Sequence, residues 1–198
     1  MSYFSMHNHS EYSNITLIDS INKLDDLIET AADMGLSGLA LTDHECLSGH
    51  IKALKKYEKI KILNPDFKLA LGNEIYITKE NLTAETHEKG EKFFHCILIA
   101  KDKIGHEQLR ELSNRAWDRS YMRSVMRRPT YMSDILDVVG DEPGHLIATT
   151  ACLGGMTGRE FLDYNSIQLA LFIYILIDYL GSQINNTTSI TTNNITKL

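Results

Sequence analysis

Histidines stand at the ends of short apolar runs in this sequence, where they could bind a metal ion. His7 and His9 follow the apolar residues Phe4 and Met6. Side chains two residues apart on an extended segment point to the same side, so both imidazoles can reach one ion. Two surface histidines near a chain end would show the same spacing, but the apolar residues before this pair anchor it to a strand.

Carboxylates follow two further apolar runs. Asp43 and His44 come directly after the run 39–41, and Glu74 follows the run 68–71 and a Gly-Asn step. Asp43 either binds an ion, orients a ligating histidine or caps the following helix. Glu74 either bridges two ions or is a surface glutamate on an edge strand.

Two later residues extend the pattern. His95 lies inside the apolar run 93–99, where an unpaired buried polar group costs about 1–3 kcal/mol, so a metal ion or a backbone carbonyl must satisfy it. Cys152 follows the run 146–151 and is either a zinc ligand or a small buried hydrophobe. Four successive strands that each deliver a potential ligand near one end indicate a shared metal site.

The elements that must position these residues alternate between strands and helices. Apolar periodicity predicts strands at 3–6, 39–41, 68–78, 93–100 and 146–150, and helices from Asp19 or Ser20 to Met34, from 48 to 62 and from 105 to 117. This alternation implies parallel β/α units, whose chemistry lies at the C-terminal ends of the strands. The predicted fold class is α/β.

Composition places the chain among soluble globular proteins. It has 198 residues, of which 43% are hydrophobic and 23% charged, as expected for one domain or a large part of one. Its three cysteines do not suggest a disulfide framework, and no signal sequence precedes Met6, so we expect a cytoplasmic protein. The formal net charge of -6 argues weakly against a dedicated DNA-binding module.

One stretch could still bind nucleic acid locally. It places four arginines around Trp117 and Tyr121, namely Arg115, Arg119, Arg123 and Arg127. Arginines neutralise phosphates and aromatic rings stack on bases. The alternative is a solvated helix face with Trp117 packed into the core.

The chain changes character near residue 163, which predicts a domain at 1–162 and an atypical tail at 163–198. The apolar run Ile167–Leu180 is too short for a confident membrane span, so no membrane partner is expected, and a polar low-complexity segment follows it. Either the run is a buried helix before a disordered tail, or the reading frame was disrupted near Asp163.

Four motifs in this order resemble a known family. They are Met6–Ser13, Leu41–His44, Leu71–Glu74 and Ala151–Gly154, and they look like the amino-terminal PHP (polymerase and histidinol phosphatase) domain of bacterial DNA polymerase III alpha subunits. The resemblance covers residues 3–161. It is closer to the polymerase branch, because a cysteine stands in Cys-Leu-Gly and the first motif continues into Glu-Tyr-Ser.

The resemblance implies a distorted (β/α)7 barrel, incomplete here, that holds two to three zinc or manganese ions. The implied catalytic residues are Glu74 and Asp43. The implied metal ligands are His7, His9, Asp19, His44, Glu74, His95 and Cys152.

Two departures from the family pattern stand out. The family closes its site with Asp-x-His on a late strand, and this sequence contains no Asp-x-His. The family also usually has glycine where this chain has Glu45, which adds negative charge at the mouth of the site. The retained ligands argue for an active parent protein, and the missing motif argues that this chain alone is weak or inactive.

The implied function is hydrolysis of phosphodiesters or phosphoesters, as a 3′ to 5′ exonuclease in the intact parent. The implied partners are a DNA 3′ end or single strand and the remaining polymerase domains or replisome subunits. At this length we expect no polymerase palm in the chain, and therefore no polymerisation of DNA. A non-catalytic scaffold that stabilises the polymerase and a free-standing PHP phosphatase are the alternatives.

Overall fold

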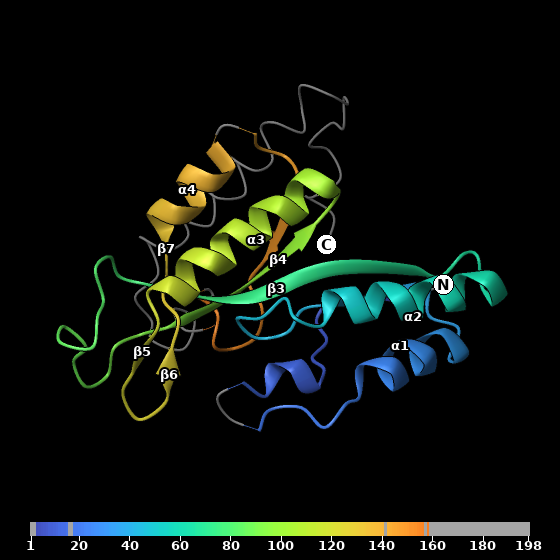
Figure 1. Cartoon of the computed structure of the whole chain (residues 1–198), viewed down its shortest axis with the longest axis horizontal. Helices are drawn as coiled ribbons and strands as arrows, with labels where there is room; N and C mark the ends of the chain where they lie inside the picture. The colour runs from blue at the N-terminus through green and yellow to red at the C-terminus, as the bar shows by residue number, and fades with distance from the viewer. Residues whose placement is uncertain (1–2, 16–17, 141, 157, 159–198) are drawn as a thin grey trace.

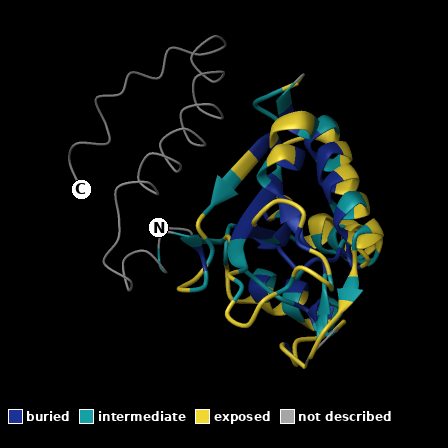
Figure 2. Cartoon of the chain, turned by 90° about the vertical axis from the view of Figure 1, so that its left-hand side faces the viewer, coloured by how far each residue is buried: buried dark blue, intermediate teal, exposed yellow. Residues whose placement is uncertain are grey.

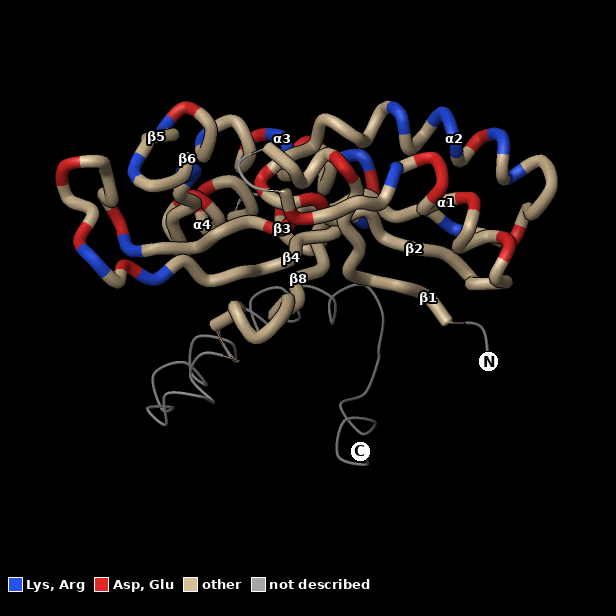
Figure 3. The backbone as a smooth tube through the Cα atoms, turned by 90° about the horizontal axis from the view of Figure 1, so that it is seen from below, with Lys and Arg blue, Asp and Glu red and all other residues tan. Residues whose placement is uncertain are grey.

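The protein folds around one curved, mixed sheet with its helices on one side (Figures 1 and 3). This computed structural model describes residues 3–15, 18–140, 142–156 and 158. The strand order is β1-β2-β3-β4-β8, and β7 pairs with the end of β3. The strands are β1 Phe4–Ser5, β2 Gly38–Leu41, β3 Lys68–Thr78, β4 Phe94–Ala100, β7 Thr130–Tyr131 and β8 Leu146–Thr149. This curled sheet confirms the predicted α/β class and its part-barrel character.

Four α-helices and two smaller elements complete the described structure. The helices are α1 Leu24–Asp33, α2 His50–Leu63, α3 Lys103–Asp118 and α4 Met132–Gly140, together with the 3-10 turn η1 Glu11–Ser13. A separate hairpin joins β5 Tyr121–Met122 to β6 Met126–Arg127. None of the helices in the described residues has the length and apolar character that a membrane crossing needs.

The alternation of strands and helices implied a sheet of parallel units throughout, but the sheet is mixed. β1, β2 and β3 are parallel, but β4 is antiparallel to β3 and β8 is antiparallel to β4. A parallel connection needs a crossover, usually a helix. The segment from Lys79 to Phe93 contains only turns and irregular backbone, so the chain turns back and β4 runs beside β3 in the opposite direction.

Helix α1 begins at Leu24, so the predicted start at Asp19 or Ser20 is wrong. Asn14 Oδ1 accepts hydrogen bonds from the backbone N–H groups of Asp19 (2.7 Å) and Ser20 (2.9 Å), which fixes these residues in a loop. The carboxylate of Glu11 accepts the N–H of Leu24 at 2.5 Å and thereby satisfies one free donor at the helix start. The predicted stop is confirmed, since Gly35 follows the helix with φ +75°.

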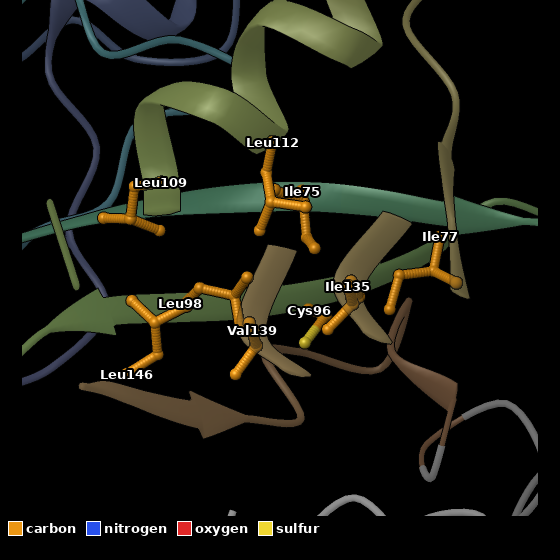
Figure 4. Packing of buried hydrophobic residues seen from close by; sticks show 9 residues of the cluster. All are labelled: Ile75, Ile77, Cys96, Leu98, Leu109, Leu112, Ile135, Val139 and Leu146. Carbon is orange, nitrogen blue, oxygen red and sulfur yellow. The ribbon is translucent and has the colours of Figure 1, made fainter. Parts of the chain in front are cut away.

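Apolar side chains pack on both faces of the sheet, and Figure 2 shows that the central strands are largely buried. One cluster lies between α3, α4 and the strands β3, β4 and β8, and Figure 4 shows Ile75, Ile77, Cys96, Leu98, Leu109, Leu112, Ile135, Val139 and Leu146 in contact there. A second cluster joins α1 and α2 to β2. Ala40, Ile97 and Ile99 pack on the face turned away from the helices. Each fully buried Leu, Ile or Phe contributes about 1.5–3 kcal/mol, so packing fixes the strands that carry the polar residues.

The tail falls outside the described residues. The predicted boundary at residue 162 and the apolar run Ile167–Leu180 both lie there.

Candidate metal centre

Strand alternation places the central acidic residue on the inner face of the sheet. Ile75 and Ile77 of β3 pack against the helices, so Glu74 and Tyr76 point to the opposite face. His95 of β4 pairs with Tyr76 in the antiparallel register and shares that face. Because β4 runs antiparallel, His95 near its start lies at the edge where the parallel strands end.

The first two histidines are held by the residue between them. Asn8 Nδ2 donates to the backbone carbonyls of Ala40 (2.9 Å) and Ser5 (3.1 Å), so Asn8 is fixed to β1 and β2. His7 and His9 therefore point away from Asn8 and toward Glu74. The expected common direction of the His-x-His pair is present.

Four imidazoles converge on the Glu74 carboxylate. Its Oε2 lies 2.8 Å from His7 Nε2, 3.1 Å from His9 Nε2 and 3.6 Å from His44 Nδ1. Its Oε1 lies 2.6 Å from His95 Nδ1. On the outer side, His44 Nε2 lies 3.1 Å from Asp19 Oδ2.

These side chains form three overlapping groups, and within each group the potential ligand atoms lie within 4.8 Å of one another. The groups are His7, His9 and Glu74; His9, Asp19 and His44; and His44, Glu74 and His95. His9, His44 and Glu74 each belong to two groups. Of these three, Glu74 has two oxygens and could bridge two neighbouring ions, whereas each neutral imidazole has one free lone pair and could serve only one ion.

Glu74 is buried with an unsatisfied oxygen. Its exposed fraction is 0%, which excludes the alternative of a surface glutamate. His95 Nδ1 is close to Oε1 but outside hydrogen-bonding geometry, so this oxygen has no hydrogen-bond partner among the described residues. An unsatisfied buried acceptor is costly. Imidazole nitrogens around a carboxylate are suitable ligands for zinc or manganese, so the residues present fit such an ion.

The electrostatics keep Glu74 ionised. Burial alone would raise its pKa, but its contacts with His9 and His95 outweigh burial and hold the pKa of the carboxyl well below its ordinary value. Burial lowers the pKa of His44. Burial also opposes the charging of His9, yet the hydrogen bond with Glu74 raises the pKa of that imidazole overall. An ionised carboxylate beside a neutral imidazole is the state that binds metal.

The carboxylate of Asp43 is surrounded by hydrogen-bond donors rather than by other potential metal ligands. Its exposed fraction is 1%, and its oxygens accept hydrogen bonds from Ser10 N (2.6 Å), Ser10 Oγ (2.8 Å) and Ser13 Oγ (2.8 Å). It belongs to none of the three groups and does not cap α2, whose N-cap is Gly49. These contacts favour the supporting role that holds the first loop over the predicted catalytic one.

Cys152 lies beside the centre. Its Sγ is 3.6 Å from His95 Nδ1 and accepts the N–H of Gly154 at 3.3 Å. The thiol is exposed, which excludes the alternative of a buried hydrophobe. It lies outside the three groups, so its role as a ligand stays a prediction.

The four predicted nucleic-acid arginines do not form one free surface. Arg115 pairs with Asp137 at 2.6 Å and Arg119 pairs with Asp134 at 2.5 Å. Arg123 donates to the carbonyl of His87, whereas Arg127 borders a cavity beside the histidines. The alternative that packed Trp117 into the core is also wrong, since its exposed fraction is 42% and its Nε1 donates to the Glu45 carbonyl.

Sequence reasoning missed three contributors. Tyr76 forms a 2.9 Å hydrogen bond with His44 Nδ1 and stacks on His95. Ser10 and Ser13 hold Asp43. Both serines lie in the first motif, so their spacing within it could have marked them as part of the site. Nothing in the sequence marks Tyr76, because tyrosine is common in strands.

A mixed sheet with histidines and carboxylates gathered at one edge defines an α/β domain with a candidate metal site. The sequence model of the PHP domain family matches residues 5–182, and the chain belongs to this family. The resemblance seen in the motifs is thereby confirmed. The domain boundary predicted at residue 162 falls inside the matched range and stays a prediction.

Relatives of the chain are large DNA polymerases. A DNA-directed DNA polymerase of Bacillus phage SPbeta is 44% identical over 168 residues, which cover 82% of this chain and 13% of the polymerase. The DNA polymerase III subunit alpha of Borreliella burgdorferi is 33% identical over 161 residues, covering 81% of this chain and 13% of that subunit. The chain thus spans about 13% of the length of these relatives.

A solved amidohydrolase from Chromobacterium violaceum aligns with 56% of this chain and 33% of its own length. The sequence identity is 18% and the TM-score is 0.38.

Proposed function

We propose that this chain is the PHP portion of a replicative DNA polymerase and hydrolyses phosphodiester bonds with bound metal ions. In the parent protein the activity is that of a 3′ to 5′ exonuclease. The observation that supports the proposal is the overlap of three ligand groups on one buried carboxylate, Glu74. A merely structural histidine cluster has no need for a carboxylate shared in this way.

The proposed ions are zinc or manganese, two to three in the complete site. His7, His9 and Glu74 would hold one, and His44, Glu74 and His95 a second. Asp19, which groups with His9 and His44, would add a carboxylate oxygen to an ion held by one of these histidines, because a neutral imidazole has a single free lone pair and serves one ion. Such ions supply Lewis-acid chemistry, since they polarise a phosphoryl group and make water a better nucleophile at neutral pH.

The protein's own groups organise this centre. Glu74 stays ionised between the imidazoles and sets their separation. Tyr76 orients the His44 ring through its hydroxyl, and Asp43 fixes the loop that carries His9 through Ser10. Pre-organised ligands of this kind keep the geometry of a metal site tight.

The proposed partners follow from the polymerase relatives. They are a DNA 3′ end or single strand and the remaining polymerase domains or replisome subunits, in the cytoplasm, without a membrane. The polymerase relatives support this assignment over a free-standing phosphatase.

The test compares metal content with hydrolysis. We expect zinc or manganese to copurify at one or more equivalents, and a 5′-labelled single-stranded oligonucleotide to be shortened slowly from its 3′ end when manganese is added. Glu74→Gln keeps the size of the side chain but removes the bridging charge, so both metal content and hydrolysis should fall by about tenfold or more. Glu88→Gln, in an exposed turn, is the control. A folded protein without metal would overturn the proposal.

A second candidate is a non-catalytic scaffold, favoured by the absence of Asp-x-His from the sequence. Supplying the late strand from a longer gene discriminates between the two. Restored hydrolysis supports the enzyme, whereas metal binding with no hydrolysis in the completed domain supports the scaffold.

A further inference from the structure

A cavity opens beside the metal centre, lined in part by residues of the β5–β6 hairpin, which Figure 1 labels. Its volume is about 120 Å³, well above the ~10–15 Å³ that one water needs. Asp19, His44 and Tyr76 line one side, and Met126 and Arg127 of the hairpin line the other. A group bound in this cavity would therefore lie against the ligand cluster and against a guanidinium at the same time.

Arg127 has an unusual environment among the arginines of this region. Its guanidinium stacks on the Phe93 ring, with 4.7 Å from Cζ to the ring centroid, which fixes the plane of the group. Its Nε is buried and has no hydrogen-bond partner among the described residues. By contrast, Arg115 and Arg119 bind carboxylates at 2.6 and 2.5 Å. Arg127 is thus oriented by an aromatic ring and left with a donor to satisfy.

The nearby acidic side chain does not take up this donor. Glu45 borders the same cavity, but its Oε2 already accepts from Arg128 Nη1 at 3.3 Å, and its Oε1 has no hydrogen-bond partner in the described part of the chain. A buried donor without a partner costs about 1–3 kcal/mol. Nε itself is buried, so an anionic ligand in the cavity would reach the guanidinium of Arg127 through its outer nitrogens.

We infer that Arg127 binds a phosphate oxygen of the substrate and holds the phosphoryl group in this cavity, against the metal centre. The inference rests on the proposed phosphoesterase function and names a residue and a substrate class for it. A planar guanidinium forms paired, charge-assisted hydrogen bonds with phosphate. Of the four arginines that the sequence marked for nucleic acid, Arg127 is the one placed to contact the group at the ligand cluster.

The experiment measures phosphate binding directly, by titration calorimetry on the zinc-loaded chain. The variants are Arg127→Gln, Arg127→Lys and, as control, Arg110→Gln, which removes the same charge from an exposed position on α3. Inorganic phosphate should bind about 10- to 100-fold more weakly to Arg127→Gln, the equivalent of ~1.5–3 kcal/mol for a charged hydrogen bond. Arg127→Lys keeps the positive charge but not the paired donors of a guanidinium, so its affinity for phosphate should lie between those of the wild type and Arg127→Gln. The affinity of Arg110→Gln should match that of the wild type.

A second arm replaces inorganic phosphate with thymidine 5′-monophosphate. A larger effect of Arg127→Gln on the nucleotide supports a nucleic-acid phosphate as the source, and equal effects support a simple phosphoester. Zinc content is measured for every variant. Unchanged phosphate binding in Arg127→Gln at full zinc content overturns the inference alone, whereas a wild-type chain that binds no zinc overturns the proposed function as well. If Arg127→Gln does not fold, Arg127→Lys decides, because wild-type affinity in that variant contradicts recognition by a paired fork.

Discussion

At the residue scale, Glu45 combines two features that each cost free energy. Its backbone is left-handed, with φ +50°, a conformation that costs a residue with a Cβ about 1–2 kcal/mol. Its carboxyl is also buried, and burial raises the pKa to about 7 although the charge of Arg128 opposes the shift. The glycine usual in the family at this point would adopt the backbone without strain.

The backbone strain gives a prediction that needs no assumption about metal. Glu45→Gly and Glu45→Ala both remove the carboxylate, but only glycine relieves the left-handed strain. We expect Glu45→Gly to be more stable than Glu45→Ala by about 1–2 kcal/mol in urea unfolding. The control is Glu107 in α3, where the order should reverse because glycine weakens a helix by ~1 kcal/mol relative to alanine. The same order at both positions would contradict the strain argument.

The sequence predicted which residues lie close together better than it predicted the residues that hold them in place. His7, His9 and Glu74 were predicted from strand ends and the structure brings them together. The role of Asp43 could not be predicted, because it depends on which loop folds over it, and Ser10 and Ser13 do so. The spacing of residues predicts the position of a side chain along a strand, but it does not predict which hydrogen-bond donors contact that side chain.

At the element scale, helix α2 begins with a buried histidine. The exposed fraction of His50 is 2%. Its Nε2 lies 3.0 Å from the Gly72 carbonyl, and its Nδ1 lies 3.0 Å from His106 Nε2. Burial is the main cause that lowers its pKa from 6.5 to about 4. The folded state therefore holds His50 neutral across the pH range in which the unfolded chain protonates it.

This shift predicts a loss of stability in mild acid. His50 binds a proton in the unfolded chain below pH 6.5 but in the folded chain only near pH 4, so stability falls as the pH drops through this window. The contribution is about 2 kcal/mol between pH 7 and pH 5. His50→Gln keeps a donor for Gly72 and should reduce the acid sensitivity by that amount, measured as the difference between the two proteins in urea unfolding at each pH. Parallel pH curves for the two proteins would rule out this role.

The strands β1 to β4 and β8 and the helices α1 to α3 were predicted, whereas helix α4 and the direction of β4 were not. The strands at Lys68–Thr78 and Phe94–Ala100 match their apolar runs. Apolar periodicity predicts which residues of a strand are buried, but it does not predict the direction in which the strand runs. The antiparallel pairing of β4 follows from the irregular segment before it. The late start of α1 follows from Asn14, whose hydrogen bonds to the loop backbone no helix pattern reveals.

At the scale of the whole molecule, the centre links segments that are far apart in sequence. His7 and His9 follow β1, Glu74 lies in β3 and His95 lies in β4, so metal binding needs most of the sheet to be formed. A ligand that binds only the folded state stabilises it by about 2.7 kcal/mol at a hundredfold excess over Kd.

We therefore expect zinc to raise the thermal midpoint by about 5–10 °C for a domain of this size. A chelator should remove the gain. The double variant His7→Ala and His9→Ala should show a smaller shift, because one of the three groups loses two members and a second group loses one. Zinc that binds stoichiometrically without changing the midpoint would argue for a surface site.

The positions of the ligands along the chain have a consequence for biosynthesis. Every member of the three groups lies between His7 and His95, within the first half of the 198 residues. At ~5–20 residues per second, N-terminal regions fold while the remainder is still being made. A nascent chain that has completed β4 already contains all the ligands of the three groups, so ion capture could begin on the ribosome and guide the later strands to a sheet that is already held.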